Sequence, residues 1–494
     1  MSIPTTALVW LRRDLRLADN PALQQALLEY ERVIPIFIHD PLALAPWLDG
    51  AASRWWLHHS LAQLTAALRA RGSELLIARG DSLTCLRRVI AASGARHCCW
   101  NRCYEPAAIA RDIQIKQALR ADGISCTSHN AALWFEPWTI QSGSGTPYRV
   151  FTAWWRRCQP QLGQIPLPSP APAHLPPLPP DLPNQPLASL ELLPRINWDS
   201  GFADIWHPGE DGAWQRVEQF LTSAAPHYAT HRDLPAVDGT SRLAPYLSWG
   251  NLSPRQLLPH LLTTGGDQAA FMRELGWREF SYHLLYHFPT TPAQPLNPRF
   301  ADFPWRTDAP AHWLPAWQRG QTGIPLVDAG MRQLWHCGWM HNRVRMIVAS
   351  FLTKNLRLPW QLGARWFWET LVDADLANNT QGWQWTAGCG ADAAPYVRIF
   401  NPVLQGQRFD PTGDYVKRWC PELAQLPSKW IHQPSAAPAA ILTAAGVELG
   451  KHYPRPLVDL AQSRQEALAA WQALARSAPS VSSSTRVAKP DNSA

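Results

Sequence analysis

The chain has 494 residues and a formal net charge of +7 at pH 7, a length that can bury the cores of two or three domains. The positive balance favours a polyanionic partner, although a general preference for Arg codons would leave the same composition. Nine Cys without a repeated CxxC pair argue against a disulfide scaffold, and the lack of a signal peptide or of about 18 uninterrupted apolar residues argues against export or a membrane span. We therefore expect a soluble, cytoplasmic protein.

Residues 7–128 alternate short apolar runs with amphipathic stretches, which predicts a parallel sheet covered by helices on both faces. The predicted strands are 7–11, 33–38, 74–78, 97–101 and 124–127, and the predicted helices are 21–31, 53–71, 83–92 and 107–121. No GxGxxG follows the first strand, so the α/β domain, placed at 1–135, is Rossmann-like or flavodoxin-like without a standard dinucleotide fingerprint.

A Pro-rich segment follows this domain. Eight prolines occur within 159–194, and such a run cannot form a helix, so it predicts an extended connector along the surface. The prolines are Pro166, Pro168, Pro170, Pro172, Pro176, Pro177, Pro179 and Pro180. We place the connector at 136–211.

The rest of the chain, 212–475, has helical patterns and no strong strand pattern. Ser253 and Pro254 have the residue types of an N-cap and a first helical position. Apolar residues at spacings of three and four predict helices at 327–334, 344–354 and 364–371. The last segment, 476–494, is Ser-rich with few apolar residues, which predicts disorder.

Residues 373–385 concentrate two carboxylates, two adjacent Asn amides and two indoles in one short stretch. Two Asp without nearby His or Cys are too few for a metal site, so we predict none. A polar heteroaromatic ligand fits these side chains better, since the amides donate and accept without titrating. The alternative is a capped helix end with buried Trp. The six side chains are those of Asp373, Asp375, Asn378, Asn379, Trp383 and Trp385.

Two further clusters have helical spacing. Glu274, Trp277 and Arg278 share one face, and this mixture is a poor core but a good pocket lining, because a buried charge needs a partner. A surface salt bridge beside a half-buried Trp is the alternative. The other cluster, Asn342, Arg345 and Met346, lies on one face of a second helix, and Arg343 points elsewhere.

Residues 239–250 (Gly-Thr-Ser-Arg-Leu-Ala-Pro-Tyr-Leu-Ser-Trp-Gly) place hydroxyls and backbone amides beside an Arg. Successive amides in a turn can form an anion-binding nest. An ordinary helix-entry loop would have the same composition.

Together, Gly-Trp-Met-His-Asn-Arg-Val-Arg-Met at 338–346, Glu-Leu-Gly-Trp-Arg-Glu-Phe at 274–280 and the 373–385 stretch resemble the photolyase/cryptochrome family of flavoproteins. The likeness runs from about residue 7 to 470 and is greatest to the bacterial class I cyclobutane-dimer branch. It implies an α/β antenna-binding domain, an all-α FAD-binding domain, and light-driven repair of cyclobutane pyrimidine dimers in UV-damaged DNA by a monomer.

The resemblance also assigns residues to FAD. Asn379 would lie against flavin N5, and Ala244 stands where the family usually has Ser, so one phosphate-facing hydroxyl is missing. The implied FAD-binding residues are Tyr228, Thr240, Ser241, Arg242, Leu243, Ala244, Arg278, Arg345, Asp373, Ala374, Asp375 and Asn379.

Three indoles, Trp383, Trp360 and Trp305, match the family's electron relay, although plain core packing is the alternative for each. Asn342 and Met346 match the cyclobutane-dimer type rather than the His-rich (6-4) type. Residues implied to contact damaged DNA are Arg232, Glu274, Trp277, Asn342, Arg343, Met346, Trp385 and Arg398, with Glu274 also counted as catalytic.

In the α/β domain, Asn101 and Glu105 would lie near an antenna pigment, for which methenyltetrahydrofolate is preferred and a deazaflavin is the alternative. Two rival functions are a cryptochrome that signals through partners and a helical nucleic-acid-binding protein without a chromophore.

Overall fold

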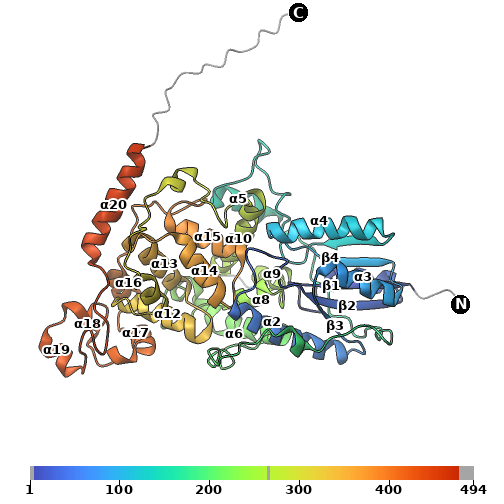
Figure 1. The fold of residues 1–494 in the computed structure, drawn as a ribbon, viewed down its shortest axis with the longest axis horizontal. Coiled ribbons are helices and arrows are strands. Elements are labelled where there is room, and N and C mark those ends of the chain that lie inside the picture. Colours follow the sequence, from blue (N-terminus) through green and yellow to red (C-terminus); the bar gives the residue numbers. More distant parts are fainter. Residues whose placement is uncertain (1–4, 264–267, 478–494) are drawn as a thin grey trace, which may run out of the picture.

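The computed structural model describes residues 5–263 and 268–477, which form an α/β half and a helical half side by side (Figure 1). A five-stranded parallel sheet in the order β3-β2-β1-β4-β5 forms the centre of the α/β half. All five predicted strands are present. They are β1 (Thr6–Leu11), β2 (Arg32–His39), β3 (Leu76–Arg79), β4 (His97–Asn101) and β5 (Ser125–His129).

Helices cover both faces of the sheet, because the strands are apolar on both sides. Ala7, Val9 and Leu11 of β1 pack with α1 (Pro21–Glu29) and α2 (Ala51–Arg69). Leu8 and Trp10 pack with α3 (Ser82–Ser93) and α4 (Pro106–Ala121) on the other face. The core on the α2 side continues without a break into the helical half.

The two halves are joined by buried polar contacts as well as by this core. The Arg16 guanidinium, 1% exposed, donates to the Gly250 carbonyl of the helical half at 2.9 Å and to the Ala131 carbonyl of its own half at 2.8 Å. The Trp56 indole donates to the Asn251 side chain at 2.9 Å. Such contacts fix the orientation of the two halves.

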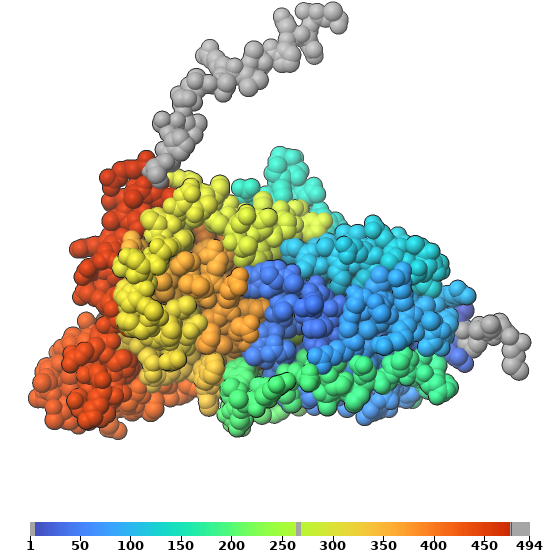
Figure 2. Space-filling view, viewed as in Figure 1, coloured from blue at the N-terminus to red at the C-terminus, as the bar shows by residue number. Residues whose placement is uncertain are grey.

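The Pro-rich segment is extended, as predicted, and runs along the α/β half (Figure 2, green). The backbone amide of Asp19 donates to the Ser169 carbonyl, and that of Leu175 donates to the Arg71 carbonyl. The backbone amide of Gln185 donates to the carbonyl of Ile77, which lies in β3. The segment therefore protects the β3 edge of the sheet. Earlier, α5 (Phe151–Cys158) packs on the helical half and leads into a 3-10 turn at Gln159–Gln164.

Apart from an isolated bridge between Leu449 and Tyr453, the described part of 212–475 contains no strand, as predicted. Ser253 caps α9 (Pro254–Thr263), because its Oγ accepts from the backbone amide of Gln256 at 3.1 Å. The predicted helix 344–354 is α13 (Asn342–Ser350) continued by a π-helical turn, Phe351–Asn355. The helices are α6 (Glu210–Gln219), α7 (Tyr228–His231), α8 (Ala244–Ser248), α9 (Pro254–Thr263), α10 (Gln268–His287), α11 (Trp313–Gln318), α12 (Pro325–Cys337), α13 (Asn342–Ser350), α14 (Trp360–Thr370), α15 (Leu376–Ala387), α16 (Pro402–Phe409), α17 (Asp414–Trp419), α18 (Ser428–Ile431), α19 (Ala439–Ala444) and α20 (Leu460–Ser477).

The nine Cys are free thiols, in agreement with the sequence prediction. No helix among residues 5–263 and 268–477 has the length and apolar character needed to cross a membrane. The predicted disordered tail falls almost entirely on 478–494, which lies outside the described residues.

Candidate functional site

A cavity of about 430 Å³ opens in the helical half, walled mainly by α10, α13, α14 and α15. The three clusters found in the sequence meet here, although they are far apart along the chain. Predicted residues that line the cavity are Arg232, Glu274, Trp277, Arg278, Asn342, Arg345, Met346, Asp373, Ala374, Asp375, Asn379, Trp383 and Trp385.

At the floor of the cavity, Asp373 is paired with Arg345. Its Oδ2 accepts from Arg345 Nη2 at 2.8 Å, and Arg345 Nε also donates to the Met340 carbonyl at 2.7 Å. Asp373 Oδ1 and Trp383 Nε1 are buried without a hydrogen-bond partner among the described residues. Buried polar atoms are nearly always paired, so an acceptor and a donor in one cavity wall fit a ligand with complementary polar edges.

Asp375 combines the two interpretations of its stretch, because it caps α15 and also lines the cavity. Its Oδ1 accepts from the backbone amide of Asn378 at 2.8 Å and its Oδ2 accepts from the Tyr282 hydroxyl. The side-chain amide nitrogen of Asn379 donates to the Ala364 carbonyl at 3.0 Å. No local sequence pattern connects Tyr282 with Asp375, since the two residues lie 93 positions apart in the chain.

One cavity wall rests on α10. Arg278 donates to the Ala132 carbonyl at 2.9 Å, and its neighbour Glu279 accepts from the backbone amides of Trp134 (2.9 Å) and Phe135 (3.2 Å). Burial raises the pKa of the Glu279 carboxyl to about 7. The loop 132–135 is thereby fastened to the cavity wall.

Two ion pairs lie at or beside the mouth of the cavity: Arg232 and Glu274 line it, whereas Arg343 and Asp233 do not. Arg232 Nη1 lies 2.7 Å from Glu274 Oε1, and Arg343 Nη2 lies 2.7 Å from Asp233 Oδ1. As the helical spacing predicted, Arg343 points away from the cavity lining. Both arginines thus have carboxylate partners, a feature that the sequence did not reveal.

Trp277 stacks on Phe151 with ring centroids 3.8 Å apart and an interplanar angle of 12°. Phe151 comes from the connector, and no local sequence pattern links it with this site. The contact holds the Trp277 indole flat at the cavity mouth.

The loop predicted to bind phosphate adjoins the cavity but does not line it. Arg242 has a positive φ of 51°, its guanidinium lies over Trp339, and its Nε is buried without a partner among the described residues. Ser241 Oγ accepts from the backbone amide of Leu243 at 3.3 Å.

Thr240 and Ala244 flank these residues, and Ala244 begins α8. Ser248 of α8 donates through its Oγ to the Ala374 carbonyl at 3.0 Å. Tyr228 is buried against Phe220 and Phe271.

Among the three predicted relay indoles, Trp383 lines the cavity and packs against Phe367 (5.0 Å) and Trp317 (6.2 Å). Its ring also lies on Gly363, where an added Cβ would be only 2.0 Å from an indole carbon. Trp360 is buried in α14, three residues before Gly363.

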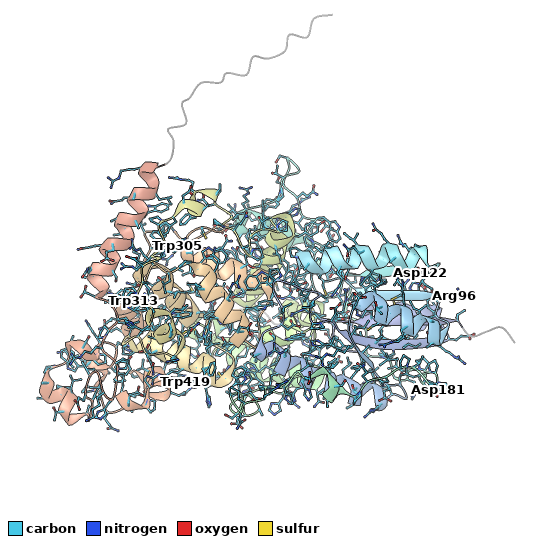
Figure 3. All side chains as sticks on the ribbon, viewed as in Figure 1. Arg96, Asp122, Asp181, Trp305, Trp313 and Trp419 are labelled. Atoms are coloured by element: carbon cyan, nitrogen blue, oxygen red, sulfur yellow. The ribbon has the colours of Figure 1, made fainter. Side chains whose placement is uncertain are left out.

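Trp305 is half-buried on the outer side of the helical half (Figure 3). No ring contact joins it to Trp360, or Trp360 to Trp383, within the described part of the chain, and Trp305 packs on Phe303 at 4.5 Å. Trp317, which is not one of the three predicted relay indoles, is in ring contact with Trp383. Arg398 is exposed, stands outside the cavity and lies over Phe400.

The two predicted antenna residues behave differently. Asn101 is buried, and its side chain bonds Asp14 (2.6 Å) and Asn20 (2.7 Å), so it supports the fold and lines neither nearby pocket. Glu105 lines both pockets: one at the carboxyl ends of the strands, of about 60 Å³, and one between the halves, of about 390 Å³. The antenna role of Asn101 therefore stays a prediction, and its side-chain amide nitrogen already has partners within the α/β half.

No group of three or more His, Cys, Asp or Glu among the described residues could hold a metal ion. Fold and cavity together define a two-half protein whose helical half contains a cavity lined by carboxylate, amide and indole side chains.

The chain belongs to the photolyase/cryptochrome family. A family model described as the FAD binding domain of DNA photolyase matches residues 271–473, and one described as DNA photolyase matches residues 7–175. The helical half is thus an FAD-binding domain of the photolyase type, and the two orphaned atoms in the cavity wall fit such a cofactor.

Relatives include both branches of the family. A deoxyribodipyrimidine photo-lyase of Agrobacterium fabrum is 46% identical over 96% of this chain and 99% of its own length. Cryptochrome-2 of Arabidopsis thaliana is 38% identical over 94% of this chain and 78% of its own length. A solved bacterial class III photolyase from Agrobacterium tumefaciens superimposes with a TM-score of 0.93, at 45% identity over 96% of this chain and 99% of the other. The sequence had instead favoured class I.

Proposed function

We propose that this chain is a light-dependent DNA repair enzyme that splits cyclobutane pyrimidine dimers. The observation that carries the proposal is the meeting, in one cavity, of a polar floor suited to FAD and a mouth that bears Trp277, Asn342 and Met346. Reduced FAD, excited by blue light, supplies the electron that opens the cyclobutane ring and accepts it back.

On this proposal the floor residues bind and orient the cofactor. Asp373 and Asp375 would accept hydrogen bonds from its ring edge and ribityl chain, with Arg345 balancing the charge of Asp373. Asn379 would lie against flavin N5, and the 240–244 loop would hold the diphosphate. Since Arg242 Nε is buried without a partner in the described residues, a phosphate oxygen would satisfy it.

The mouth residues receive the damaged DNA. Glu274 and Asn342 hydrogen-bond the edges of the dimer, and Trp277 and Met346 pack against it with Trp385 nearby. Extruding the dimer from the duplex costs a few kcal/mol, less at a damaged step. Arg232, Arg343 and Arg398 neutralise backbone phosphates, which position the strand while the pocket recognises the lesion.

The test is illumination of the purified, reduced protein with UV-irradiated thymine oligomers while the absorbance of intact thymine is followed. Recovery of that absorbance under blue light, and none in the dark, is expected. A protein that binds FAD and leaves the oligomers unchanged would contradict the repair function.

Trp383, Trp360 and Trp305 are proposed to carry an electron from the outside of the helical half toward the cavity. Trp360→Phe should abolish photoreduction of oxidised FAD, with repair by chemically pre-reduced protein largely intact. Equal loss of both activities would argue against a relay role. Because Trp317 contacts Trp383, Trp317→Phe is the informative companion variant.

An antenna pigment is proposed at Glu105, whose carboxylate could hydrogen-bond a pterin ring, so methenyltetrahydrofolate is preferred to a deazaflavin. The inter-half pocket also offers Trp47 and Trp368 as apolar walls. Glu105→Gln should diminish the second chromophore's absorbance while FAD stays bound. Unchanged absorbance would count against Glu105 as the antenna contact.

The second candidate function is blue-light signalling, favoured by the 38% identity to a plant cryptochrome. It predicts bound FAD without repair of thymine dimers, so the illumination experiment separates the two functions. We further propose a cytoplasmic monomer, which size-exclusion chromatography with light scattering can test.

A further inference from the structure

Tyr282 lies on α10 between the α/β half and the cavity floor. The side chain is 5% exposed, and its hydroxyl donates to Asp375 Oδ2. Burial and the neighbouring Asp375 carboxylate raise the pKa of the Tyr282 hydroxyl well above its usual value. The hydroxyl therefore keeps its proton and acts as a donor.

The remaining contacts of Asp375 leave little freedom to its carboxylate. Oδ1 accepts from the backbone amide (2.8 Å) and side-chain amide (2.7 Å) of Asn378. Those two donors belong to the same helix turn as Asp375, whereas Tyr282 comes from a separate helix. Among the described residues, Tyr282 is the one hydrogen-bond donor from another helix that reaches this carboxylate.

The Tyr282 ring is itself held from the α/β half. Tyr104, which follows β4, packs edge-on against it with centroids 6.0 Å apart, and the Tyr104 hydroxyl donates to Glu136 Oε2 at 2.8 Å. The guanidinium of Arg278 lies 5.0 Å from the ring centroid on the cavity side. Steric contact and charge thus determine where the hydroxyl points.

We propose that Tyr282 is a positioning residue that presents the Asp375 carboxylate to the bound flavin and so tunes the cofactor's affinity and its visible spectrum. This inference rests on the proposed function, because it assumes that the ligand above Asp375 is FAD. It adds a residue that makes no cavity-lining contact of its own.

The experiment measures FAD binding to apoprotein by flavin fluorescence, together with the visible absorption of the bound oxidised cofactor. The variants are Tyr282→Phe, Asp375→Asn and the double variant. Tyr286→Phe is the matched control, since it sits one turn further along α10 and its hydroxyl has no hydrogen bond within the described residues. Cooperative thermal unfolding of each apoprotein is checked first.

Tyr282→Phe should weaken FAD binding about tenfold, as for loss of a hydrogen bond to a charged group, and shift the visible band, with Tyr286→Phe unchanged. In the Asp375→Asn background the same substitution should have little further effect. Equal affinity and spectrum in Tyr282→Phe, or fully additive losses in the double variant, would overturn the inference alone. A wild-type protein that takes up no FAD would overturn the proposed function as well.

Discussion

The floor and the mouth of the cavity use the same chemistry, a carboxylate beside an arginine, but their carboxylates differ in exposure. At the floor, the side chain of Asp373 is 3% exposed and that of Arg345 is 23% exposed. Beside the mouth, Asp233 is 35% exposed and Arg343 is 19% exposed. A buried pair is costly to break because its partner remains desolvated, whereas an exposed pair contributes little. On the proposed function, the floor is therefore preorganised for a resident cofactor, and the mouth pairs would exchange their carboxylates for DNA phosphates.

The largest expected effect is at the floor. Arg345→Met leaves the buried Asp373 carboxylate without its partner and should lower the free energy of unfolding by about 3–5 kcal/mol. Arg343→Met, at the mouth, should change it by no more than about 1 kcal/mol. Urea denaturation of both variants measures the difference, and Arg345→Met combined with Asp373→Asn should recover most of the loss. Equal losses at floor and mouth would remove the basis of the comparison.

The wall behind the floor should respond to pH through Glu279. Its folded-state pKa, about 7, lies above the ordinary value of 4.5 because of burial. Its stabilising contribution is therefore fully present below the unfolded pKa and is lost as the pH rises through about 7. The loss amounts to at most about 3 kcal/mol.

Glu279→Gln still accepts from Trp134 and Phe135 but cannot ionise, so thermal unfolding from pH 5 to pH 8.5 should lose this downward slope. The exposed Glu218→Gln on α6 is the control and should leave the slope intact. A slope that survives in Glu279→Gln would show that another group causes it.

At the mouth, Asn342→His should reduce repair of thymine dimers about tenfold in kcat/KM, or about 1.4 kcal/mol of transition-state stabilisation. Asn342 is exposed in the first turn of α13, so the flavin content and the unfolding midpoint should not change. Repair at the wild-type rate would contradict the assignment of Asn342 to the dimer.

The smallest effect concerns the mouth pairs themselves. Arg343→Gln should reduce the slope of log affinity against log salt by about 1, equally for damaged and undamaged DNA. Asp233→Asn should instead raise the affinity for DNA, because the DNA phosphate no longer competes with this carboxylate for Arg343. Titrations at several salt concentrations measure both, and weaker binding by Asp233→Asn would mean that Asp233 orients Arg343 instead.

Several features of the site could be predicted from local sequence. Helical spacing placed Asn342, Arg345 and Met346 on one face and Arg343 on another, because side chains three and four apart are neighbours on any α-helix. The same logic found Glu274, Trp277 and Arg278. The buried hydrogen-bond network of Asn101 could not be predicted, since this residue type suits a ligand contact and such a network equally well.

By itself, the sequence determined the five parallel strands, the helical second half, the extended connector and the membership of the clusters that form the cavity. These follow from hydrophobic periodicity and turn chemistry, which act over a few residues. Only the tertiary structure decided that Tyr282 bonds Asp375, that Asp233 holds Arg343, and that Trp317 lies against Trp383. Each of these contacts joins elements far apart in the chain, and its geometry depends on how packed helices cross, which no local pattern encodes.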